Sequence, residues 1–374
     1  NLVVKEYTSV QCGAQQFEKY VHLLKGKNVA IVTNQTGIVG NKSIVDTLLT
    51  LKLKIKKIFG PEHGFRGNTE AGMKVNSNKD IKTGLPVISL YGSNKKPTKE
   101  QLKGIHTVIY DIQDVGVRFY TYISTMCYVM EACAENNIEM IVLDRPNPNG
   151  FYVDGPVMQN ELKGFLGLHN IPVVYGMTCG EYAKMANEEG WLNNGIKCKL
   201  KIIPCLNYDR NATYVLPINP SPNLPNNESV LLYPGIGLFE GTEMSVGRGT
   251  KFPFQVIGHP NYPDTNFYFI PKPNELTKTP KYFNKKCYGI NLLDSDYLKN
   301  HPKKIALNFL IDAYKKMKPL EFFNNGFNAH SGNPKLMQQI KDGLSENEIR
   351  KTWENDLKTF LQIRQKHLIY SDFN

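Results

Sequence analysis

The stretch FGPEHGFRG, residues 59–67, combines an acid, an imidazole and a guanidinium with three glycines and a proline. The charged side chains are those of Glu62, His63 and Arg66, and they follow a short apolar run. Glycine lets a backbone turn tightly and approach a ligand closely. The stretch is therefore either a surface turn, in which Glu62 caps the turn or pairs with Arg66, or a loop that directs a carboxylate into a cleft.

Polar side chains of the same kinds follow three further apolar runs. They are acids, amides and arginines, namely Asn34, Gln35, Asp111, Asp114, Arg118, Asp144 and Arg145. In an open parallel sheet, ligands bind beyond the carboxyl ends of the strands, near the point where the strand order reverses. The repeated pattern therefore favours a polar active-site cleft at that edge of an α/β domain.

Each of these residues also has a structural interpretation. The amides can hydrogen-bond their own turn. The two aspartates can cap the next helix or pair with an arginine, and the Asp-Arg pair can hold the turn before two prolines. Because structural ion pairs resemble functional ones, the residues alone leave both interpretations open.

A second glycine-rich polar loop, FEGTEMSVGRGT, spans residues 239–250. Its Glu240, Thr242 and Arg248 can reach over the cleft from the C-terminal side, or the loop is a flexible connection. The chain has no P-loop, zincin or nucleophile-elbow motif and no Cys-x-x-Cys pair. What remains is carboxylate chemistry: cleavage of a glycosidic bond by carboxyl groups, or hydrolysis of a phosphoester with a divalent metal.

Short β-branched runs alternate with helical patterns in the first half of the chain, which predicts an α/β domain with a mostly parallel sheet covered on both faces. We expect residues 1–205 to form this doubly wound domain and residues 206–374 to form a smaller α+β domain. A loop rich in proline and asparagine, residues 216–229, follows the change. The last helices should bury one apolar face, made by Ile349, Trp353, Leu357, Phe360 and Leu361.

The composition is that of an ordinary globular protein. The chain has 374 residues, 41% of them hydrophobic and 21% charged, and its length suits about two domains. The net charge of +11 comes from dispersed lysines without a nucleic-acid motif, so it indicates a lysine-rich surface or attraction to an anionic polymer such as a cell-wall glycan. The seven cysteines are expected to be free and mostly buried. No membrane span and no signal peptide are visible.

Ten motifs occur in an order that is typical of one family. They are LLKGKNVAIVTNQTG, FGPEHGFRG, SLYG, DIQDVGVRFYTYISTM, VLDRPNPNG, GPV, YGMTCGEYA, NPSPNLP, LLYPGIGLFEGTEMSVGRGT and PFQVIGHP. On these motifs, the sequence resembles the domain of unknown function 1343 family. These proteins are described as NamZ-type exo-β-N-acetylmuramidases of glycoside hydrolase family 171.

This resemblance implies a glycosidase that releases terminal β-N-acetylmuramic acid from the non-reducing end of peptidoglycan fragments, and no cofactor is expected. It implies a Rossmann-like domain, a smaller C-terminal domain, and an active site in the cleft between them. It also implies that Glu62 is the catalytic acid/base. A bacterial role in cell wall recycling favours the periplasm or secretion, with muramyl saccharides rather than nucleic acid as partners.

We further expect Asp111 or Asp114 to supply the second catalytic carboxylate. The lactyl carboxylate of muramic acid suits an arginine fork, supplied by Arg118, Arg145 or Arg248. The remaining substrate-binding candidates are Asn34, Gln35, His63, Arg66, Tyr120, Asp144, Glu240 and Thr242. Two alternatives remain open: a metal-dependent hydrolase using Asp111, Asp114 and Glu62, and a cell-wall glycan-binding protein without catalytic activity.

Overall fold

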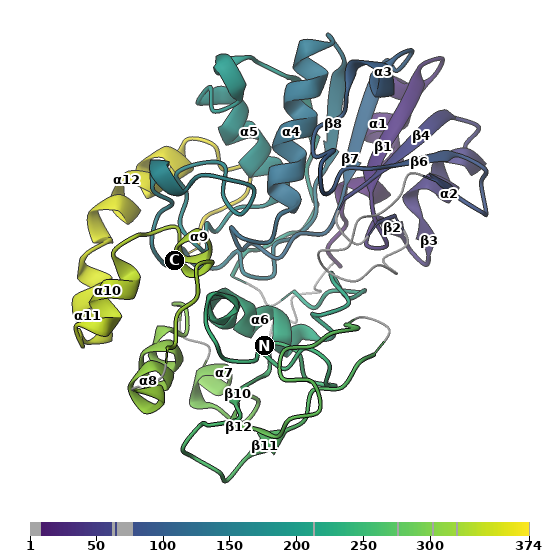
Figure 1. Ribbon diagram of the computed structural model, residues 1–374. Coiled ribbons are helices and arrows are strands. Elements are labelled where there is room, and N and C mark those ends of the chain that lie inside the picture. Colours follow the sequence, from purple (N-terminus) through teal and green to yellow (C-terminus); the bar gives the residue numbers. More distant parts are fainter. Residues whose placement is uncertain are drawn as a thin grey trace, which may run out of the picture.

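The computed structural model of the chain describes residues 9–61, 64–65, 78–211, 214–274, 277–300, 303–318 and 321–373 (Figure 1). Within these ranges, seven strands form the main sheet in the order β5-β6-β4-β1-β7-β8-β9. Their bounds are β1 Asn28–Thr33, β4 Lys54–Gly60, β5 Asn78–Lys79, β6 Pro86–Ser89, β7 Thr107–Asp111, β8 Glu139–Leu143 and β9 Lys199–Ile203. Neighbouring strands pair in parallel, except that the short edge strand β5 is antiparallel to β6.

The strand order reverses between β1 and β7. From β1 the chain proceeds outward through β4 to β6, then returns to β7 and proceeds through β8 to β9 on the other side. This is the strand order of the Rossmann fold, whose ligands bind at the carboxyl ends of the strands beside the reversal. The predicted α/β, Rossmann-like fold is confirmed.

Helices cover both faces of the sheet because its strands alternate apolar side chains between two cores. In β1, Val29 and Ile31 belong to the core on the side of α1 and α2, whereas Ala30 and Val32 belong to the core on the side of α4 and α5. The helices of this domain are α1 Phe17–Leu24, α2 Ile44–Thr50, α3 Lys99–Leu102, α4 Tyr122–Glu135 and α5 Cys179–Glu188. A small hairpin of β2 Ile38–Val39 and β3 Lys42–Ser43 precedes α2.

The C-terminal part of the chain forms a smaller domain, which lies on the opposite side of the molecule from the parallel sheet (Figure 1). Its antiparallel sheet has the order β10-β12-β11, with β10 Val256–His259, β11 Tyr268–Phe269 and β12 Cys287–Asn291. Its helices are α6 Asn227–Ile236, α7 Asp296–Asn300, α8 Leu307–Met317, α9 Phe327–Ser331, α10 Leu336–Lys341, α11 Glu346–Lys351 and α12 Glu354–Gln365. The domain boundary after residue 205 stays a prediction.

The predicted apolar face of the last helices is confirmed for most of its members. Ile349, Trp353 and Phe360 are buried, but Leu361 is 36% exposed, so its assignment was wrong. The helix is interrupted between α11 and α12, but the inward positions keep the helical spacing through Leu357, which packs against the core, and Phe360 to the buried Arg364, so Leu361 falls at the edge of the apolar face.

Two further expectations concern the cysteines and membranes. All seven cysteines are free and buried, as expected. Among the described residues, no helix combines the length and hydropathy that crossing a membrane requires.

Candidate active site

The carboxyl ends of β1 and β7 bring the first group of predicted site residues together. Thr33 at the end of β1 pairs in register with Asp111 at the end of β7. Asp111 accepts two hydrogen bonds from Arg145, which follows β8: 2.6 Å from Nε to Oδ1 and 3.0 Å from Nη2 to Oδ2. Both side chains are buried. Burial raises the pKa of the Asp111 carboxyl, and the positive charge of Arg145 opposes that shift.

Asp144 anchors the start of α5. Its Oδ1 accepts hydrogen bonds from the backbone N–H groups of Arg145 and Gly180, and its Oδ2 accepts from the hydroxyls of Thr178 and Tyr370 at 2.7 and 2.6 Å. Thr178 also caps α5, as its position before the helical pattern suggests. Burial raises the pKa of the Asp144 carboxyl to about 6.

Asp114 lies beyond the end of β7 in a separate buried environment. Its Oδ2 accepts hydrogen bonds from the Gly116 N–H at 2.7 Å and from the Tyr175 hydroxyl at 2.5 Å. Its Oδ1 is buried and has no hydrogen-bond partner among the described residues. Burial raises the pKa of this carboxyl to about 6.

The predicted amides bond within the protein. Asn34 Oδ1 accepts from the N–H and the hydroxyl of Thr36, which is the turn-stabilising pattern considered from the sequence. Gln35 Nε2 donates to the carbonyl of Pro220 at 3.2 Å, so it holds the proline-rich loop against the sheet. Thr242 is buried, and its hydroxyl donates to the Phe239 carbonyl.

Arg118 is fully buried and joins three segments of backbone. It donates to the carbonyls of Pro156, Ile171 and His330 at 2.8, 3.0 and 2.9 Å. Burial lowers the pKa of its guanidinium to about 9. The arginine therefore joins the α/β domain to the last turn of α9 from inside the protein.

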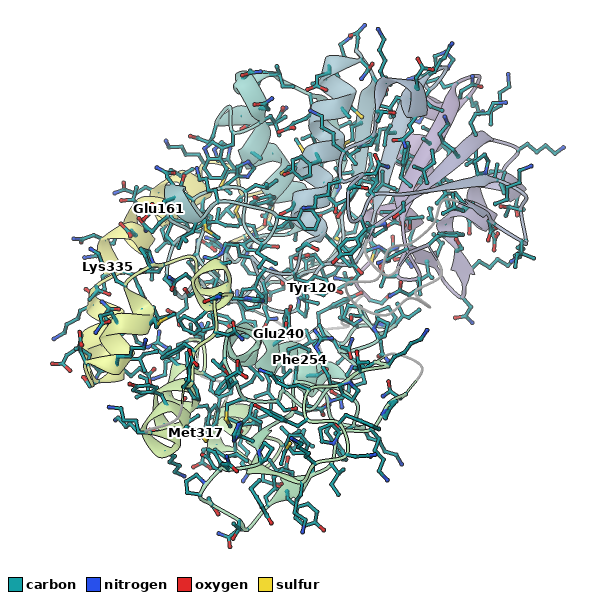
Figure 2. The ribbon with its side chains drawn as sticks, viewed as in Figure 1. Tyr120, Glu161, Glu240, Phe254, Met317 and Lys335 are labelled. Atoms are coloured by element: carbon teal, nitrogen blue, oxygen red, sulfur yellow. The ribbon has the colours of Figure 1, made fainter. Side chains whose placement is uncertain are left out.

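A cavity of about 170 Å³ lies between the α/β domain and the C-terminal domain. Its buried floor is largely aromatic and is made by Phe119, Tyr120, Tyr122, Tyr233 and Phe254, together with the polar residues Thr121, Ser221 and Asn223 and with Leu224. Its rim is half-buried and consists of Tyr91, Phe165, Leu166, Glu240, Arg248 and His330. Figure 2 shows Tyr120, Glu240 and Phe254 grouped between the two domains.

The aromatic floor is held by edge-to-face contacts. Tyr233 contacts Tyr120 at 5.9 Å and Phe254 at 4.9 Å between ring centroids, with the rings nearly perpendicular. The Tyr120 hydroxyl donates to the Pro220 carbonyl at 2.8 Å. Such rings offer a rigid apolar surface with hydroxyl groups at its edge, which is suited to a ligand with apolar and polar faces.

The charged side of the rim is an ion pair from the second glycine-rich loop. Glu240 Oε1 accepts from Arg248 at 2.7 Å from Nη2 and 3.0 Å from Nε. The two side chains remain 25% and 26% exposed. The Arg248 guanidinium also lies 5.0 Å from the centroid of the Phe254 ring. These contacts position a cation on the wall of the cavity.

Of the residues predicted from the sequence, Tyr120, Glu240 and Arg248 line the cavity. The other polar candidates at the ends of the strands do not line the cavity: Asp111 pairs with Arg145. Asp144 bonds backbone N–H groups and the hydroxyls of Thr178 and Tyr370, and Asn34 bonds Thr36 through Oδ1. Glu62, His63 and Arg66 lie outside the described residues.

The sequence reasoning missed most of the aromatic lining. Tyr91, Tyr122, Asn223 and Tyr233 do fall within the family motifs SLYG, RFYTYISTM, NPSPNLP and LLYPG, so the motifs carried a usable signal. Phe165 and His330 lie in segments where no pattern marked them.

Comparisons with known proteins identify the family of the chain. The family model for the N-terminal part of the exo-β-N-acetylmuramidase NamZ matches residues 29–228, and the model for its C-terminal part matches residues 231–370. The peptidoglycan β-N-acetylmuramidase NamZ of Bacillus subtilis (strain 168) is 40% identical over 372 residues, which is 94% of this chain and 89% of that protein.

Two crystal structures of DUF1343 family proteins from Bacteroides fragilis NCTC 9343 are similar over nearly the whole chain. The first has 44% identity and a TM-score of 0.91, covering 98% of this chain and 100% of the other. The second has 29% identity and a TM-score of 0.83, covering 97% and 99%. The two-domain α/β protein is therefore a glycosidase. It belongs to the NamZ exo-β-N-acetylmuramidase family.

Proposed function

We propose that this glycosidase releases terminal β-N-acetylmuramic acid from the non-reducing end of peptidoglycan fragments. The observation that carries the proposal is the cavity between the domains, which combines an aromatic floor with the Glu240–Arg248 pair on its rim. Aromatic rings suit the apolar face of a sugar, and a cation suits the carboxylate that distinguishes muramic acid from glucosamine. The substrate named for the Bacillus subtilis relative supports the same assignment.

The size of the cavity supports exo-action. An apolar cavity of about 150 Å³ holds one benzene ring, so a cavity of about 170 Å³ suits one pyranose whose substituents reach the rim. The next sugar would then lie at the rim, which is the arrangement we propose for removal of one terminal residue at a time.

We propose Glu62 as the group that protonates the leaving oxygen. The described backbone next to it supports this assignment. Gly60, at the end of β4, accepts a hydrogen bond from the Leu90 N–H at 2.8 Å, and the next residue, Tyr91, lines the cavity. Glu62 is two residues beyond Gly60 in the sequence, and two residues span at most about 7 Å of chain.

We propose Arg248 as the residue that binds the lactyl carboxylate. Of the three arginines considered from the sequence, Arg145 is enclosed with Asp111 and Arg118 is enclosed with backbone carbonyls. Arg248 lines the cavity, and Glu240 holds its guanidinium fork. A planar fork recognises a carboxylate through two parallel hydrogen bonds, and the net charge of +11 favours the approach of an anionic substrate.

The test is release of sugar from a chromogenic β-N-acetylmuramide by the wild-type protein and by Glu62→Gln. We expect the wild type to cleave the muramide in preference to the matching glucosaminide, and the variant to lose on the order of 10²- to 10⁴-fold in kcat, the usual contribution of a general acid. Chelator should leave the rate unchanged. No release by the wild type would favour a glycan-binding protein, and a rate lost in chelator would favour the metal-dependent hydrolase.

A role in cell wall recycling is part of the proposal, with the periplasm or the cell exterior as the location. Fractionation of the source cells, with detection of the protein in each fraction, tests this location. Recovery in the cytoplasmic fraction would contradict it.

A further inference from the structure

The rim of the cavity has two chemically different sides. Glu240, Arg248 and His330 come from the C-terminal domain and are charged or polar, whereas Tyr91, Phe165 and Leu166 come from the other domain and are aromatic or apolar. The proposed function gives the first side a role, the binding of the lactyl carboxylate. It gives the second side no role, although its three side chains remain partly exposed.

Phe165 and Leu166 occupy the tip of a closed turn. The N–H of Gly164 donates to the carbonyl of Gly167 at 3.1 Å, and the N–H of Gly167 donates back to Gly164 at 2.9 Å. Turn tips normally carry Gly, Asn, Asp, Ser or Pro. Leu166 packs against the core, and Phe165 remains partly exposed beside the cavity, so a ligand that covers the Phe165 ring would bury more apolar surface.

The turn is rigidly supported. A Cβ atom on Gly167 would lie 2.5 Å from the Met158 side chain and 2.9 Å from Cδ of the buried Arg118, so the turn packs directly on that arginine. Lys95 Nζ lies 4.7 Å from the centroid of the Phe165 ring. The Tyr128 ring is parallel to Phe165 within 6° at 6.3 Å between centroids. These contacts hold the ring in place before any ligand arrives.

We propose that Phe165, together with Tyr91, forms the binding site for the sugar that leaves in the reaction, a neutral N-acetylated pyranose such as N-acetylglucosamine. The inference rests on the proposed function, in which the cavity takes the terminal residue and the next sugar lies at the rim. A neutral sugar has no charge to pair with a guanidinium, whereas its C–H face gains apolar contact from an aromatic ring, so we place it on the apolar side. The two sides of the rim then bind the two sugars of the cleaved bond.

The test compares a disaccharide with a monosaccharide. The KM for the disaccharide of N-acetylmuramic acid linked β-1,4 to N-acetylglucosamine is measured for the wild type, Phe165→Ala and Phe165→Tyr. The inhibition constant of free N-acetylmuramic acid is measured for the same proteins. Phe283→Ala is the matched control, because Phe283 is a half-exposed phenylalanine of the C-terminal domain that does not line the cavity.

We expect Phe165→Ala to raise the KM for the disaccharide about tenfold, the loss of one aromatic contact. The inhibition constant of the monosaccharide should change less than about twofold, Phe165→Tyr should keep the wild-type KM, and Phe283→Ala should resemble the wild type. An equal loss for both ligands, or no loss for either, would overturn the inference while leaving the muramidase activity intact. Failure of the wild type to cleave the disaccharide would overturn both proposals.

Discussion

Two regions of this molecule contain the same residue types and use them differently. At the ends of β1, β7 and β8, Asp111, Asp144 and Arg145 are buried, and their polar atoms are bonded within the protein. At the cavity, Glu240 and Arg248 form a similar ion pair, but about a quarter of each side chain is exposed. The first pair joins strands, and the second faces the space where a ligand fits.

This difference shows how to distinguish structural residues from ligand-binding residues when both groups consist of carboxylates and arginines. A buried ion pair whose hydrogen bonds are complete has little capacity left for a substrate, but removing one partner leaves an uncompensated charge. A partly exposed pair contributes little to stability, yet its charge remains accessible. The predictions below test this division.

The largest effect is expected for Asp111→Asn. The variant leaves Arg145 buried without a charged partner, which typically costs about 3–5 kcal/mol. We therefore expect the melting temperature to fall by on the order of 10 °C, while the folded protein keeps its activity at lower temperature. Thermal unfolding followed by circular dichroism measures the first effect, and sugar release below the transition measures the second.

Glu240→Gln is the control for this prediction, because it breaks an ion pair of the same type on the rim. It should change the free energy of unfolding by no more than about 1 kcal/mol. If Asp111→Asn instead melts like the wild type and has lost its activity, the division is wrong, and Asp111 is the second catalytic carboxylate that the sequence suggested.

The next effect concerns Arg248. Replacing it with methionine removes charge-assisted hydrogen bonds worth roughly 1.5–3 kcal/mol, so kcat/KM for the muramide should fall about 10- to 100-fold. The rate on the glucosaminide, which lacks the lactyl carboxylate, should change little. The comparison of the two substrates is the measurement. A parallel loss on both would show that Arg248 acts on the cavity as a whole rather than on the carboxylate.

The fold could be predicted from the sequence because the features that determine it, the apolar patterns of strands and helices, are local and periodic. Short runs such as those of β1 and β7 are apolar on both faces, and Thr178 marks the start of α5 through its own side chain. The cluster of polar residues at the strand ends could be predicted too, since parallel strands place their carboxyl ends at one edge.

The division between scaffold and cavity could not be predicted in this way. Whether Arg118 or Arg248 is accessible depends on segments far away in the sequence: the carbonyls of residues 156, 171 and 330 enclose Arg118. Phe165 gave no signal either, because an apolar residue in a turn becomes meaningful only once the cavity beside it is known.

A smaller effect is the pH dependence that Asp114 contributes. Its pKa is about 6 in the folded protein and about 3.9 in an unfolded chain. Between these values the folded state holds more protons, so stability falls as pH rises from about 4 to about 6, by at most about 1.4 kcal/mol per pH unit. Asp144 acts in the same direction. Asp114→Asn should make the fall in melting temperature between pH 4 and 6 shallower than in the wild type, and an unchanged slope would contradict this.

The smallest expected effect is a change in the same pH dependence when Tyr175 is replaced. Its hydroxyl donates to Asp114 Oδ2 and thereby lowers the pKa of a carboxyl that burial has raised. Tyr175→Phe should therefore extend the fall in stability to a higher pH, and Asp114→Asn combined with Tyr175→Phe should abolish that extension. If Asp114 is scaffold, the pH profile of kcat stays in place in the single variants. If the acidic limb of that profile moves with the Tyr175 substitution, Asp114 exchanges its proton during catalysis. Asp114 is then a functional residue despite its burial.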